Sequence, residues 1–181
     1  MHKTRTQKMA FSGVTAALCV AVMFLTGVIP VATLALPAVA GCFLIAVVVE
    51  AGIKWGFCVY GVVSVLSLLV VSDREAVLFF VFFFGYYPVL YAVLSRMKNR
   101  WLSITAKYAI FNAAIALETY ISVVFLQIPI DEIPFLGAYT LVLWFLVTNI
   151  VFFVYDRAMD GLILTYLKKI QPKVRQMFRM R

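Results

Sequence analysis

The amino-acid sequence predicts an all-α integral membrane protein, a bundle of about six transmembrane helices with both termini on the cytoplasmic side. Two features of the composition predict this class: 65% of the 181 residues are apolar, and only 13% are charged. A soluble fold of this length cannot enclose so much apolar surface in one core. In a bilayer, by contrast, the outer surface of a protein can be as apolar as its interior. The third observation is the distribution of the basic residues, which is described below.

The first three spans are expected at residues 9–28, 31–49 and 55–71. The first follows a short basic stretch, as the apolar region of a secretion signal does. It is long enough to cross a bilayer, so we expect it to be retained as a helix. Pro30 marks its end. Pro37 falls in the first turns of the second span, where a missing amide is tolerated.

The last three spans are expected at residues 76–95, 108–127 and 138–155. Gly85 and Pro88 predict a kink inside the fourth span. The loops between spans are short, so consecutive helices should be antiparallel neighbours.

The basic residues give the orientation. With a cytoplasmic N-terminus, all but Arg74 of the 16 Lys and Arg residues fall on the inner side, as the positive-inside rule requires. Residues 1–155 then form the transmembrane domain. Residues 156–181 form a basic cytoplasmic tail, which is compatible with an amphipathic helix on the membrane surface. The tail predicts contact with anionic lipid. Nucleic acid is a poor alternative, because the topology already explains the net charge of +8.

The sequence has no recognisable catalytic or metal-binding set. His2 is the only histidine, which excludes histidine-based metal sites and a Ser-His-Asp triad. No phosphate-cradling loop occurs. Cys19, Cys42 and Cys58 have neither the spacing of a zinc site nor that of a disulfide framework. We therefore expect a protein that is not an enzyme and that uses no metal and no cofactor.

Glu118 is the acid that the span assignment places in mid-membrane. A charge there costs about 2.5–3.5 kcal/mol on insertion scales, so the side chain should face the bundle interior or a wet cavity. It could contact a ligand or handle a proton. It could equally be a protonated or hydrogen-bonded packing residue, paired with Asn112, Asn149 or a tyrosine.

The fourth span is crowded with aromatic side chains, most of which should meet lipid or neighbouring helices. Some could line a pocket for a flat ring, where stacking provides affinity. The candidate substrate-binding residues are Glu118, Asn112, Asn149, Tyr86 and Tyr87.

Small residues recur at four-residue spacing in the first span, at Gly13, Ala17 and Ala21. On a helix they share one face and allow another helix to approach closely. The stripe could serve packing inside this protein, or it could dock a partner membrane subunit.

Several segments give the chain a family resemblance, namely 8–11, 15–21, 37–41, 50–56 and 83–88. With six spans and both termini inside, the chain resembles the substrate-binding S component of energy-coupling factor (ECF) transporters. In that family an Ala-x-x-x-Ala pair on the first helix docks the transmembrane coupling subunit, and Ala17 and Ala21 match that pair.

The resemblance implies a multi-pass protein of the plasma membrane that binds a vitamin or a similar micronutrient near the outer face. The fourth to sixth helices and the outer loops would build the pocket. The partners would be a transmembrane coupling subunit and two cytoplasmic ATPases, whose ATP hydrolysis topples the S component so that its site opens inward.

An alternative is a non-transport membrane scaffold, similar to the rod-shape subunit of the cell-wall elongation machinery. Such a protein uses its helices for protein contacts and needs no pocket. A scaffold should tolerate Glu118→Gln, whereas a protein that binds its ligand through that acid should lose affinity.

Overall fold

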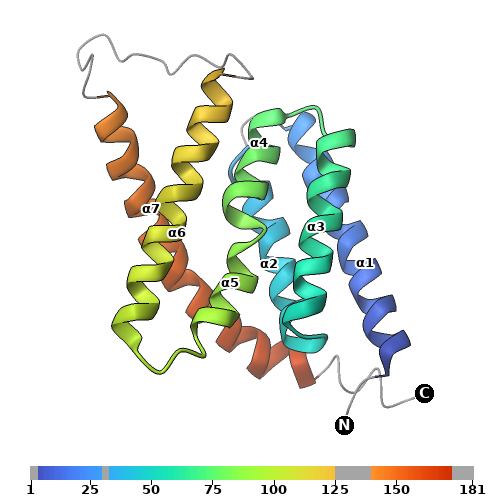
Figure 1. Cartoon of the computed structure of the whole chain (residues 1–181). Helices are drawn as coiled ribbons and strands as arrows, with labels where there is room; N and C mark the ends of the chain where they lie inside the picture. Colours follow the sequence, from blue (N-terminus) through green and yellow to red (C-terminus); the bar gives the residue numbers. More distant parts are fainter. Residues whose placement is uncertain (1–3, 30–32, 125–139, 173–181) are drawn as a thin grey trace. The chain divides into compact units, whose positions relative to one another are not determined.

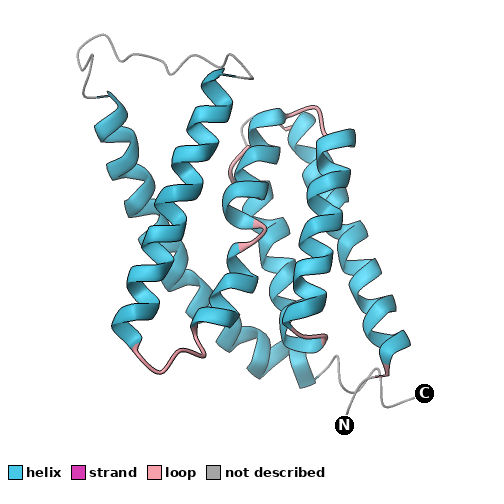
Figure 2. Ribbon diagram, viewed as in Figure 1, coloured by secondary structure: helices cyan, strands magenta, loops and turns pink. Residues whose placement is uncertain are grey.

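The computed structural model describes residues 4–29, 33–124 and 140–172, and within them every regular element is a helix (Figures 1 and 2). This confirms the all-α prediction for the described part of the chain. The chain divides into two compact units, unit 1 (Met1–Leu126) and unit 2 (Gln127–Arg181).

Unit 1 contains α1 (Arg5–Phe24) with a 3-10 turn η1 (Leu25–Gly27), α2 (Ala35–Glu50), α3 (Ile53–Val70), α4 (Arg74–Phe79), a π-helical turn η3 (Phe80–Phe84), α5 (Tyr87–Leu94) and α6 (Arg100–Val124). Unit 2 contains α7 (Thr140–Thr165), which continues into a π-helical turn η5 (Tyr166–Ile170). The helix in unit 2 therefore passes residue 155, the expected end of the sixth span, without interruption.

Four helical stretches of the described residues are long and apolar enough to cross a membrane: Arg5–Gly27, Ile53–Val70, Arg74–Leu94 and Val142–Ile170. They correspond to the first, third, fourth and sixth predicted spans. The second predicted span is α2, which is apolar but shorter, with 16 residues. The fifth is α6, a 25-residue helix that carries both Lys107 and Glu118.

Polar side chains fix where three of the helices begin. Thr4 and Gln7 form a capping box at the start of α1, in which Thr4 Oγ1 accepts from the Gln7 amide at 3.3 Å. Asp73 Oδ1 accepts the amide of Ala76 at 3.0 Å and so starts α4. Asn99 Oδ1 accepts the amide of Trp101 at 3.1 Å. This last cap begins α6 at Arg100, so the helix extends eight residues before the expected start of the fifth span.

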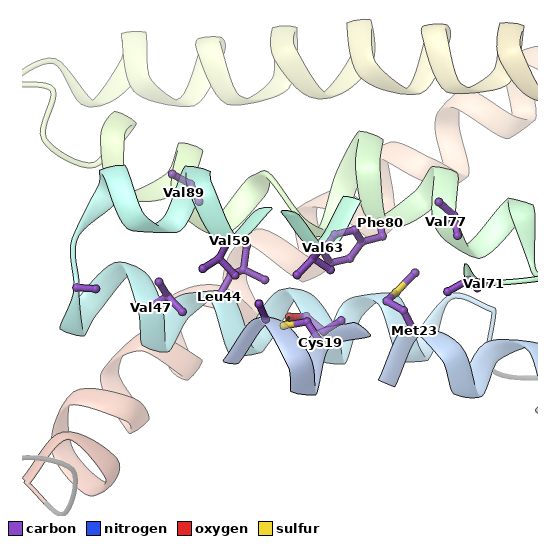
Figure 3. Close-up of a cluster of buried hydrophobic side chains, with 13 residues drawn as sticks. Cys19, Met23, Leu44, Val47, Val59, Val63, Val71, Val77, Phe80 and Val89 are labelled. Carbon is purple, nitrogen blue, oxygen red and sulfur yellow. Dashed lines mark hydrogen bonds between the residues drawn. The ribbon is translucent and has the colours of Figure 1, made fainter. Parts of the chain in front are cut away.

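The core of unit 1 lies between α1, α2, α3 and the fourth span. Figure 3 shows Cys19 of α1 near Leu44 of α2, Val63 of α3 beside Phe80 of η3, and Met23 of α1 at the other end of the cluster. All five side chains are buried. The thiol of Cys19 donates to a main-chain carbonyl of α2, at 3.4 Å. This cysteine is therefore a packing residue.

Candidate functional site

One face of α6 is buried along most of its length. Ser103, Lys107, Phe111, Ile115 and Glu118 all lie on it and are buried. The spacing of three or four residues places them on one side of the helix. This face contacts α4, η3 and α5. It is apolar in its middle and carries one ionisable group toward each end.

Glu118 occupies the end of this face nearer the outer loops of the predicted topology, and only 3% of its surface is exposed. Its carboxylate accepts a hydrogen bond of 3.0 Å from the hydroxyl of Ser122, one turn further along the same helix. Glu75, in the first turn of α4, is near enough to interact with it electrostatically. The side chain of Thr119, the next residue, also hydrogen-bonds to the carboxylate. A carboxylate has about four acceptor positions, so these two hydroxyls leave room for a further donor.

Lys107 occupies the opposite end of the face, and its ammonium lies 4.1 Å from the ring centroid of Tyr91 on α5. The Tyr91 ring in turn lies 6.3 Å from Tyr87, and Tyr87 lies 6.2 Å from Phe83. The Phe83 ring meets Phe111 of α6 edge-on at 5.0 Å. An aromatic cluster with a cation at its end thus joins α5, η3 and α6.

Lys107 is a buried residue that the sequence reasoning placed in a cytoplasmic loop flank. The burial of Lys107 could have been predicted from the four-residue spacing of 103, 107, 111 and 115. This spacing extends the buried face to residues before the expected start of the span.

The structure places Tyr86 and Tyr87 in different environments. The Tyr87 ring is fully buried in the aromatic cluster. The hydroxyl of Tyr86 is buried outside this cluster and interacts electrostatically with the phenol of Tyr60 on α3. The two adjacent tyrosines therefore do not line one surface, and only Tyr87 belongs to the group that packs on α6.

The two asparagines turn toward their own helices. The Asn112 amide donates to the carbonyl of Tyr108 at 2.9 Å, and the Asn149 amide donates to that of Phe145 at 2.7 Å. Asn112 is six positions before Glu118, about 120° around the helix, so it lies to the side of the buried face. Asn149 belongs to unit 2.

The fourth span is broken in its middle, as Gly85 and Pro88 predict. The Gly85 amide bonds to the carbonyl of Phe80 at 2.7 Å, five residues back, in place of Val81. The hydroxyl of Tyr60 donates to the Val81 carbonyl at 2.9 Å. Pro88 lies in the first turn of α5, where it needs no amide partner. The span is thus interrupted without leaving the Val81 carbonyl unpaired. The sequence pattern did not predict that Tyr60 donates the hydrogen bond to this carbonyl.

Glycine is required at two places around this break. A Cβ at Gly41 of α2 would lie 2.5 Å from the main-chain oxygen of Phe84. A Cβ at Gly85 would lie 2.7 Å from the oxygen of Phe80 and 2.8 Å from the ring of Tyr60. The backbones of α2 and η3 therefore approach as closely as they do because residue 41 has no side chain.

The small-residue stripe faces outward. Gly13, Ala17 and Ala21 are all exposed, and a Cβ at Gly13 would meet nothing within 4 Å. The opposite side of α1 makes the contacts with α2 and α3, through residues such as Ala16, Cys19 and Met23. Neither α2 nor α3 covers the stripe, so packing within unit 1 does not explain it.

No group of His, Cys, Asp and Glu side chains that could hold a metal ion occurs among residues 4–29, 33–124 and 140–172. Comparison with known proteins adds no relative: no family model, no curated protein and no solved structure matches the chain.

Proposed function

We propose that this chain is the membrane-embedded substrate-binding subunit of an ECF-type importer, with six spans and both termini in the cytoplasm of a bacterial cell. Its substrate is a vitamin or a similar micronutrient, bound near the outer face. A separate transmembrane coupling subunit and two ATPases supply the energy. The protein itself is not an enzyme.

The observation that carries the proposal is the burial of Glu118 on the face of α6 that packs against the fourth span. A buried carboxylate is stabilised by hydrogen-bond donors or a cation, and the described residues give it the hydroxyls of Ser122 and Thr119. A bound substrate with an amine or amide group is a suitable further donor.

The outward stripe on α1 supports the proposed docking of a coupling subunit. Gly13, Ala17 and Ala21 present small side chains along an apolar helix, which lets the helix of a partner approach closely. A coupling subunit is such a partner. A scaffold protein would use the stripe in the same way, so the ligand and not the stripe distinguishes the two functions.

Native mass spectrometry of the purified protein, followed by titration with a panel of vitamins, tests the proposal. We expect one small molecule to bind the wild-type protein, and Glu118→Gln to weaken its binding roughly tenfold or more, since a hydrogen bond to a charged group contributes about 1.5–3 kcal/mol. Asp160→Asn is the matched control, because that acid is exposed and belongs to unit 2. A protein that stays empty across the panel, or a Glu118→Gln variant with unchanged affinity, would favour the scaffold.

A further inference from the structure

The turn that joins α5 to α6, residues 95–99, carries a dense group of basic side chains. Arg96 and Lys98 lie in the turn and Arg100 begins α6, and all three are exposed. The sequence has no acidic residue from 76 to 117. None of the three basic side chains hydrogen-bonds to, or forms an ion pair with, another residue that the structure describes. Their charges therefore face outward without compensation from the described part of the chain.

A tryptophan follows these cations. Trp101 is 80% exposed, more than any other large apolar side chain among the described residues, and Leu102 after it is 53% exposed. An indole has an apolar body and one N–H donor, so it is suited to the boundary between water and an apolar phase. The first turn of α6 thus places an amphipathic ring and an apolar side chain directly beside the basic residues.

Hydrogen bonds hold the turn in shape. The hydroxyl of Ser103 on α6 donates to the carbonyl of Leu94 at the end of α5, at 3.1 Å. The side-chain oxygen of Asn99 accepts the amide of Trp101 at 3.1 Å. The two helix ends are therefore joined, and the exposed side chains project from a backbone that is already ordered. Such preorganisation lowers the entropic cost of binding a partner.

The turn lies at one end of unit 1. Figure 1 shows it at the end where α1 begins and where α2 is joined to α3. In the proposed topology this is the cytoplasmic end, where the membrane surface carries anionic lipid. So short a segment cannot reach far beyond the helix ends, which keeps its cations at the depth of the lipid headgroups. A guanidinium binds phosphate oxygens in a bidentate manner, and an ammonium attracts them as a point charge.

We propose that the α5–α6 turn is a binding surface for anionic phospholipid of the inner leaflet. Arg96, Lys98 and Arg100 contact the headgroup phosphates, and the Trp101 ring lies at the boundary between the headgroups and the acyl chains. The surface is additional to the basic tail. It depends on the proposed topology of the six spans but not on the proposed transport function.

Tryptophan fluorescence in lipid vesicles tests the proposal. The chain has three tryptophans, so full-length protein with Trp55→Phe and Trp144→Phe reports from Trp101 alone. The vesicles contain phosphatidylcholine and phosphatidylglycerol in equal amounts, with bromine on the acyl chains of one lipid or the other. We expect brominated phosphatidylglycerol to quench Trp101 about twofold or more strongly than brominated phosphatidylcholine, because basic residues attract anionic lipid to the protein surface.

Two triple variants separate this turn from the general charge of the surface. Arg96→Gln, Lys98→Gln and Arg100→Gln together should remove the preference of Trp101 for phosphatidylglycerol. The matched control removes three basic residues from α1 and the start of α3, at the same end of unit 1, with Arg5→Gln, Lys8→Gln and Lys54→Gln. It should leave the preference unchanged. An equal loss in both variants would show that the surface charge as a whole attracts the lipid, which would overturn the proposal.

A protein that retains only Trp144, which lies in α7, shows whether the chain is inserted. If lipid bromines quench Trp144 but not Trp101, the turn does not lie at the membrane surface, and its cations and ring are left for a protein partner. If neither tryptophan is quenched, the proposed topology is wrong and the lipid surface fails with it. Quenching of Trp101 with no preference between the two lipids would show that the turn touches the membrane without recognising anionic headgroups, and would also overturn the proposal.

Discussion

The hydroxyl of Tyr60 on α3 donates a 2.9 Å hydrogen bond to the carbonyl of Val81, the group that the π-helical turn η3 leaves without its usual main-chain amide. We expect Tyr60→Phe to destabilise the protein by about 1–3 kcal/mol, because the carbonyl then stays buried and unpaired. Thermal unfolding in detergent measures the change. Tyr120→Phe on α6 is the control, since that tyrosine is 59% exposed, and should change little. Equal effects of the two variants would show that the Tyr60 bond contributes no stability.

The close approach of α2 to η3 gives a second prediction. Gly41→Ala would place a methyl group 2.5 Å from the oxygen of Phe84, and a main-chain oxygen cannot move aside as a flexible side chain can. We expect a loss of about 1–3 kcal/mol, as for other overpacked cores. Gly61→Ala on α3 is the matched control.

A Cβ at Gly61 meets nothing within 4 Å. In mid-helix alanine is favoured over glycine by up to about 1 kcal/mol, so Gly61→Ala should leave the stability unchanged or raise it. Chemical or thermal unfolding of both variants gives the comparison. If Gly41→Ala behaves like Gly61→Ala, the backbones of α2 and η3 do not meet at residue 41.

The contact between Lys107 and the ring of Tyr91 gives a third prediction. Tyr91→Phe keeps an aromatic ring under the ammonium, whereas Tyr91→Leu removes it. We expect the leucine variant to be less stable than the phenylalanine variant by about 0.5–2 kcal/mol, the range of a partly desolvated cation–π contact. With Lys107→Met in the background, the difference should shrink. An unchanged difference would assign the effect to packing against Tyr87 alone.

The sequence predicted the parts of this fold that depend on composition and on single strong signals. Gly85 and Pro88 predicted the break in the fourth span, and the small residues of the first span predicted a face free of large side chains. The start of α6 was harder to predict, because Lys107 and Arg100 look like loop residues when charges are counted one by one. Only the four-residue spacing of its buried face identifies the true start.

The contacts around the break could not be predicted from the sequence. Tyr60 is one aromatic among many in an apolar helix, and its role depends on a carbonyl that becomes free only when η3 adopts a π-helical turn. The requirement for glycine at position 41 depends likewise on where η3 lies relative to α2. Both are long-range relationships, which local sequence patterns do not contain.

The predicted orientation can be tested with reporter fusions after Asn99 and after Gln127. The residues around Asn99 are rich in Lys and Arg, so the positive-inside rule places the first fusion in the cytoplasm. The intervening span, which includes most of α6, then places the second outside. A fusion after Asn99 that reports from the outer side would contradict the topology. A fusion after Gln127 that reports from the cytoplasm would show that α6, with its Lys107 and Glu118, does not cross the membrane.

The outward stripe on α1 gives the last prediction, which rests on the proposed function. Ala17→Trp or Ala21→Trp places a large ring on the exposed face without disturbing the core, because neither alanine packs against α2 or α3. A helix that docks on this face could then no longer approach closely. We therefore expect either variant to abolish co-purification with a co-expressed coupling subunit while the melting temperature stays within a few degrees of wild type.

Val14→Trp is the matched control, since Val14 is 64% exposed on the same helix but lies beside the stripe. A scaffold would also lose its partner, so vitamin binding is measured on the same variants. Lost co-purification with retained vitamin binding identifies a transport subunit. Unchanged co-purification would show that the stripe is not the docking surface.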